Sequence, residues 1–122
     1  MSRNSAESRK GIHLSGDRCV VCGWNKKNVK GEILVEGAHV RKGDFKLTAD
    51  YDKEDNIIAL CPNHHVEFDC GNIAIDPDRK VCLHINKDDE VANKKLIGKV
   101  DHIQRGYFDY HIKHVFKGNH HM

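Results

Sequence analysis

The 122-residue sequence predicts a small α+β domain in which a zinc ion ties a β-hairpin to the helix that follows it. Three observations carry this prediction. Two ligand pairs have the spacing of a zinc knuckle, strand-forming segments lie on both sides of a charged stretch, and apolar residues recur at helical spacing near the C-terminus. A chain of this length forms a single modest core, so an internal metal would add stability that burial alone supplies only in part.

The two ends of the chain read as polar appendages to one domain. Ser, Arg, Asn, Glu and Lys dominate residues 1–12, and no apolar period begins before Ile12, so we expect a flexible N-terminal arm there. The domain is expected over residues 13–117, and residues 118–122 form a C-terminal tail.

The central part predicts a hairpin and a helix. Residues 32–40 (EILVEGAHV) are typical of a strand, and residues 56–61 (NIIALC) predict a short buried strand that returns antiparallel to it. Residues 41–55 are charged and lack a clear period, so we expect a loop between the strands. Pro62 suits the first turn of a helix, and Gly71 is placed to end it.

A second hairpin and a last helix are expected beyond Gly71. NIAIDP (72–77) and KVCLHI (80–85) alternate apolar and polar residues around a turn sequence. From about Lys95 to Phe116, apolar residues recur every three or four positions, which predicts an amphipathic C-terminal helix.

Zinc ligation explains the cysteines better than disulfides do. Five cysteines are an odd number in a chain without an apolar export signal. Cys19 and Cys22 form one pair, and Cys61 and His64 form the other, each with two residues between the ligands. Such a gap lets one tight turn aim both side chains at one ion, so we predict a structural Zn²⁺ site. The alternative is two unrelated pairs of small polar residues.

The next histidine suggests a second metal. His65 and Asp69 are four positions apart in the expected helix and therefore share one face. Imidazole and carboxylate together suit a divalent ion such as Mg²⁺, Mn²⁺, Ni²⁺ or Zn²⁺. Taken alone, such a pair is more often an ordinary surface hydrogen bond, and the neighbouring zinc knuckle and His39 are what favour a metal site.

These residues lie in the order of a known motif. The segment AHV at 38–40, Asn56 at the start of NIIALC and His65 in CPNHHVEFD resemble the HNH motif of the ββα-metal nucleases, in particular an AHI-type branch related to restriction enzymes. The resemblance extends over roughly residues 18–117, because the knuckle and the C-terminal segment also resemble that group.

The resemblance implies a role for each motif residue. His39 matches the general base that activates water. Asn56 matches the residue that orients this histidine, and His65 together with Asp69 matches the side that holds the catalytic metal ion. Many family members carry a further ligand immediately before the base, where this chain has Ala38, so water, phosphate or a carboxylate such as Glu36 would complete the shell.

We therefore expect a metal-dependent DNA endonuclease that works with a single catalytic ion. Arg41 and Lys42 follow the base directly and are candidate DNA phosphate contacts, although such a pair is often only a solvated surface. The alternative function is a catalytically silent zinc-knuckle module that binds DNA or protein, with Ala38 marking a lost metal site. No apolar run is long enough to span a membrane, so a cytoplasmic protein is expected, and both a monomer and a homodimer remain open.

Overall fold

The computed structural model describes residues 5–42 and 53–118 of the chain. Their secondary structure is α1 (Ser5–Leu14), β1 (Glu36–His39), the 3₁₀ turn η1 (Glu54–Asn56), β2 (Ile57–Leu60), α3 (Pro62–Cys70), β3 (Ile73–Asp76), β4 (Val81–His84) and α4 (Arg105–His114). The predicted α+β fold with two β-hairpins and a C-terminal helix is confirmed. Most of the loop expected over residues 41–55 lies outside the described residues.

The first hairpin supplies one wall of the core. β1 and β2 pair antiparallel with Glu36 opposite Leu60 and His39 opposite Ile57, and every residue of β2 is buried. The strand expected over residues 32–40 is shorter than predicted, because β1 begins only at Glu36. The residues before it belong to a separate loop that projects from the domain.

Helix α3 starts and stops as its sequence predicts. Pro62 stands at the start of the helix, and the Cys61 sulfur accepts a hydrogen bond from the backbone N–H of His64. Gly71 ends the helix in the left-handed conformation, with φ of 88°. A side chain at this position would also collide with the Val115 carbonyl, since an added Cβ would lie 2.2 Å from that oxygen.

The flexible N-terminal arm expected over residues 1–12 is wrong for the residues that the structure describes, because Ser5–Leu14 form α1. The helix packs on the first hairpin through small side chains. A Cβ added at Gly11 would lie 2.6 Å from the Ile57 carbonyl oxygen, and Ser15 Oγ accepts a hydrogen bond from the backbone N–H of Ala59 at 3.1 Å. Glycine and serine provide this close contact, so no apolar period reveals it in the sequence.

The C-terminal helix is shorter than expected, since α4 covers only Arg105–His114 of the segment 95–116. The backbone N–H groups of Ile97 and Gly98 donate to the Val20 carbonyl at 2.8 and 3.1 Å. These two groups therefore form hydrogen bonds with the zinc knuckle in place of the hydrogen bonds of a helix. A Cβ at Gly98 would approach the Ser15 carbonyl oxygen to 2.7 Å, which only glycine avoids.

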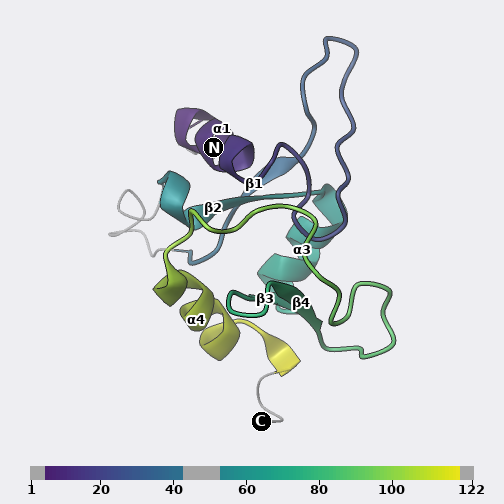
Figure 1. Ribbon diagram of the computed structural model, residues 1–122, viewed down its shortest axis with the longest axis vertical. Helices are drawn as coiled ribbons and strands as arrows, with labels where there is room; N and C mark the ends of the chain where they lie inside the picture. Colours follow the sequence, from purple (N-terminus) through teal and green to yellow (C-terminus); the bar gives the residue numbers. More distant parts are fainter. Residues whose placement is uncertain (1–4, 43–52, 119–122) are drawn as a thin grey trace.

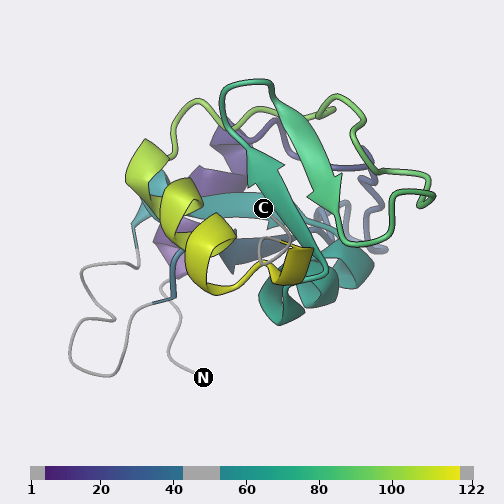
Figure 2. The same ribbon diagram turned by 90° about the horizontal axis from the view of Figure 1, so that it is seen from below.

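Helix α3 packs against both hairpins. Figure 1 shows α1 beside β1 and β2, with α4 and the β3–β4 hairpin at the other end of the molecule. Figure 2 shows α4 running alongside that second hairpin. Phe68 of α3 and Phe108 of α4 are 0% and 1% exposed, and they join these layers in one core.

Candidate active site

Two segments far apart in the sequence bring the predicted zinc ligands together. The ligand atoms of Cys19, Cys22, Cys61 and His64 all lie within 4.8 Å of one another. The Cys22 and Cys61 sulfurs are 3.9 Å apart, and His64 Nδ1 is 3.7 Å from the Cys19 sulfur and 3.3 Å from that of Cys61. Zn–S bonds of about 2.3 Å arranged tetrahedrally place sulfurs about 3.8 Å apart. The predicted convergence is confirmed, and the cluster fits a zinc ion.

The protonation of these thiols favours a bound cation. Burial raises the pKa of Cys22 to about 12, so this thiol gives up its proton readily only when a positive charge replaces it. Burial also opposes ionisation of Cys19, but hydrogen bonds from His64 and nearby backbone groups outweigh it and lower the Cys19 pKa to about 6. Of the two cysteines outside the cluster, Cys82 is buried and Cys70 is exposed to solvent.

His65 faces away from that cluster and is held between two carboxylates. Its Nδ1 lies 2.7 Å from Glu36 Oε1 of β1, and its Nε2 lies 3.3 Å from Asp69 Oδ2 one helical turn further along α3. The hydrogen bond with Asp69 raises the His65 pKa, burial partly opposes this, and Glu36 raises the pKa further. The adjacent histidines therefore point in different directions, His64 toward the cysteines and His65 toward Glu36 and Asp69.

The Asp69 carboxylate also binds a lysine. Lys42 Nζ lies 3.1 Å from Asp69 Oδ2, the same oxygen that faces His65 Nε2. Burial pulls the Asp69 pKa upward, but the contacts with His65 and Lys42 outweigh it and leave the pKa lowered. Asp69 is therefore a carboxylate at neutral pH, and it already has a cation beside it.

His39 stands at the end of β1, and the residues that follow it are fixed by Asn56. The fully buried Asn56 side chain accepts a hydrogen bond from the Arg41 N–H at 2.8 Å and donates one to the Arg41 carbonyl at 2.7 Å. The Arg41 guanidinium in turn stacks over the Tyr110 ring of α4, 4.1 Å from its centre. The chain just beyond His39 is thus held from two sides.

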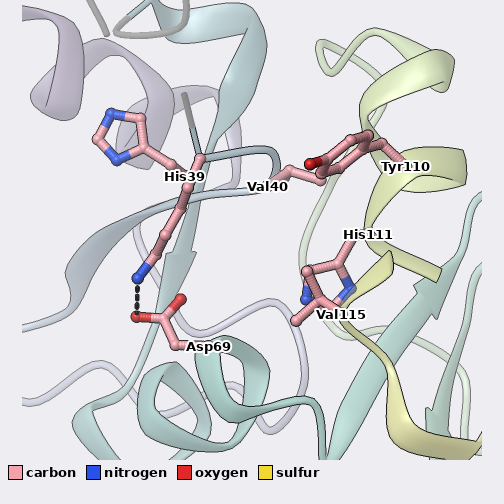
Figure 3. A pocket seen from close by; sticks show the side chains of 7 residues that line it. His39, Val40, Asp69, Tyr110, His111 and Val115 are labelled. Carbon is pink, nitrogen blue, oxygen red and sulfur yellow. Dashed lines mark ion pairs between the residues drawn. The ribbon is translucent and has the colours of Figure 1, made fainter. Parts of the chain in front are cut away.

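A cavity of about 140 Å³ lies among these residues. Figure 3 shows His39 and Asp69 on one side of it and Tyr110 and His111 of α4 on the other. The His39 ring points away from Asp69 in this view, so the structure does not bring the two side chains into contact. The lining comprises His39, Val40, Lys42, Asp69, Tyr110, His111 and Val115.

Helix α4 contributes more to this cavity than the sequence indicates. His111 is 2% exposed, stacks on Phe68 with ring centres 3.8 Å apart, and its Nε2–H donates to the Phe68 carbonyl at 2.8 Å. The only sequence signal for Tyr110 and His111 is their place in the amphipathic segment. Glu36, which the sequence offers as a possible metal ligand, lies in the structure against His65 Nδ1, the ring nitrogen that faces away from Asp69.

Comparisons with known proteins agree with these features. Residues 19–76 match a family model described as HNH endonuclease. The fold is similar to a solved structure of a modification-dependent restriction endonuclease, TagI, with a TM-score of 0.66 and 26% identity. The match covers 93% of this chain and 38% of that one, so the chain spans well under half of that enzyme. A comparison with curated proteins found no match. Within the described residues, no helix is long and apolar enough to cross a membrane.

Proposed function

We propose that the chain hydrolyses phosphodiester bonds in DNA with the help of one divalent metal ion, because residues 19–76 match the HNH endonuclease family model. The observation that carries the proposal is the pairing of His65 Nε2 with Asp69 Oδ2, 3.3 Å apart, beside the strand that ends at His39. A nitrogen and an oxygen at this separation are two donors for one ion.

The donor set at His65 and Asp69 suits a divalent ion such as Mg²⁺, Mn²⁺, Ni²⁺ or Zn²⁺. With Glu36 accepting the hydrogen on His65 Nδ1, loss of the proton from Nε2 would leave its lone pair directed to the Asp69 side. Ala38 is fully buried and offers no donor, so the protein supplies two ligands and leaves positions for water and phosphate. An ion held there would stabilise the negative charge that develops on the scissile phosphate.

We propose His39 as the general base. It lies at the rim of the cavity and takes the proton of an attacking water once its side chain turns toward the substrate. Asn56 is a positioning residue, because its two hydrogen bonds to Arg41 fix the backbone immediately after the base.

Lys42 has a double role in this proposal. In the structure its ammonium group neutralises Asp69, at 3.1 Å. A metal ion that binds Asp69 competes with that ion pair, and the released lysine is then available to contact a DNA phosphate. Arg41 is the second candidate phosphate contact, although its stacking on Tyr110 also gives it a structural part.

The cysteine cluster is proposed as a structural zinc site that holds the hairpin and α3 in register. Purified protein should contain about one zinc per chain, and Cys61→Ser should unfold or aggregate, because structural zinc contributes folding free energy directly. Metal analysis and thermal unfolding measure both. A stable, folded and zinc-free protein would contradict this part of the proposal.

Plasmid cleavage tests the activity. Supercoiled DNA is incubated with protein and Mg²⁺, Mn²⁺ or Ni²⁺, with a chelator control and with His65→Ala beside wild type. Nicked DNA that appears only with the ion and only with His65 intact supports the proposal. Nicked product preceding linear product indicates a monomer, whereas direct linear product with a steep dependence on protein concentration indicates a homodimer. DNA binding without any ion-dependent cleavage would favour the silent zinc-knuckle module.

A further inference from the structure

A narrow projecting loop connects the zinc knuckle to β1. Residues 26–34, here called the lysine finger, fold back on themselves, with Leu34 N–H donating to the Lys26 carbonyl at 2.8 Å and Lys27 bridged to Ile33. In Figure 1 the finger is part of the blue loop that extends beyond the rest of the molecule, away from α4.

The tip of the finger is built by one side chain. Asn28 Oδ1 accepts from the backbone N–H groups of Lys30 and Glu32 at 2.8 and 3.0 Å, and its amide donates to the Glu32 carboxylate at 2.9 Å. Gly31 takes a φ of 82°, which closes the turn. These bonds give the finger a defined shape, although its tip extends away from the core.

The side chains on the finger are of the kind that bind a nucleic acid. Lys26, Lys27 and Lys30 are exposed, and Val29 at the tip is fully exposed. An apolar side chain held in water at the end of a projecting turn contributes no hydrophobic free energy to folding. Three cations around one apolar tip match a phosphate backbone with a groove between its strands.

The finger also leads directly to the proposed catalytic site. Only Val35 separates it from Glu36, whose carboxylate binds His65 at 2.7 Å. Seven residue steps separate Val29 from Glu36, so at about 3.3 Å per extended residue the two lie at most about 23 Å apart. Base pairs are spaced about 3.4 Å apart along DNA, so this upper limit equals about seven base pairs, or about two-thirds of a helical turn.

We infer that the lysine finger is a DNA-binding element whose lysines contact backbone phosphates within about two-thirds of a helical turn of the scissile bond while Val29 enters the groove between them. This inference rests on the proposed function, since it takes duplex DNA as the partner. A protein partner fits the finger less well, because lysine is depleted in protein–protein interfaces.

Salt-dependent binding to a fluorescent duplex, without added divalent ion so that nothing is cleaved, tests the inference. The finger variant replaces Lys26, Lys27 and Lys30 with glutamine and keeps Asn28, Gly31 and Glu32. The matched control replaces the exposed Lys87, Lys94 and Lys99 with glutamine, which removes the same charge elsewhere. The plot of log affinity against log salt is compared between about 50 and 200 mM.

Each lost phosphate contact reduces the steepness of the plot of log affinity against log salt by about 0.9. The slope of the finger variant should therefore be shallower by about 2 to 3, and its affinity near 100 mM salt should be at least about tenfold lower. The control should change its slope by less than about one contact. Val29→Ser should weaken binding severalfold with an unchanged slope, because an apolar contact releases no counterions.

Each other outcome overturns the inference. If the control loses as much as the finger variant, net charge rather than the finger drives binding. If the finger variant binds like wild type, the finger contacts something other than DNA, such as a protein, while the proposed function stands. If wild type neither binds nor cleaves any duplex, the proposed function fails together with the inference.

Discussion

Replacing Glu36 with glutamine tests whether the hydrogen bond between Glu36 and His65 Nδ1 orients His65 as a metal ligand. Glutamine keeps an oxygen that can accept the hydrogen on His65 Nδ1 and loses the charge. The present contact is 2.7 Å long, and the side chains of His65 and Glu36 are 15% and 45% exposed. A hydrogen bond to a charged group contributes about 1.5–3 kcal/mol, and solvent around the half-exposed Glu36 reduces this to about 1–2 kcal/mol.

That range corresponds to metal binding about 5- to 30-fold weaker, since 1.4 kcal/mol is about tenfold. The assay is calorimetric titration of the zinc-loaded protein with Mn²⁺ at about pH 8, because the raised pKa of His65 lets a proton compete with the ion at lower pH. Glu90→Gln, an exposed carboxylate after β4, is the matched control and should bind Mn²⁺ like wild type. A Glu36→Gln affinity within twofold of wild type, with a His65-dependent site still present, would refute the orienting role.

Three further predictions follow from the contacts of the site. His64→Ala should lower zinc content and melt the fold, whereas His65→Ala should keep both and lose cleavage; equal zinc loss in the two variants would show that they share one site. Lys42→Gln should lower the Mn²⁺ concentration needed for half-saturation by severalfold, since it removes the cation beside Asp69; an unchanged or higher value would show that the lysine does not compete with the ion. Burial lowers the His111 pKa, with the bond to the Phe68 carbonyl partly opposing it, so the unfolded chain binds more protons below about pH 6.5 and the free energy of unfolding falls as the pH drops. His111→Gln should reduce this pH dependence of the free energy of unfolding, measured by urea unfolding. An equal pH dependence in wild type and variant would show that other groups cause it.

Short spacings made part of the site predictable from sequence. The two zinc pairs each depend on a gap of two residues, and His65 with Asp69 depends on one helical turn, so local geometry decides these contacts. The contact between Glu36 and His65 joins residues that are 29 positions apart. It depends on the register of β1 with β2 and on the packing of α3, neither of which a local pattern contains.

The misplaced elements have different causes. Residues 32–34 belong to the segment predicted as a strand, but the turn closed by Asn28 and Gly31 directs them into the lysine finger. Helix α1 and the residue that follows it contact the hairpin through Gly11 and Ser15, which carry no hydrophobic signal. Local side-chain hydrogen bonds decide the first case, and a tertiary contact decides the second.

The central claim is that one ion on His65 and Asp69 works together with His39 as the base. Single-turnover cleavage of plasmid DNA by His39→Ala, at saturating Mn²⁺ and with DNA and Mn²⁺ affinities measured in parallel, tests it most directly. A residue that acts on the proton of water lowers the rate constant and leaves binding intact. The account predicts a rate at least about 100-fold below wild type, with both affinities within a few fold. Cleavage by His39→Ala at the wild-type rate would contradict it.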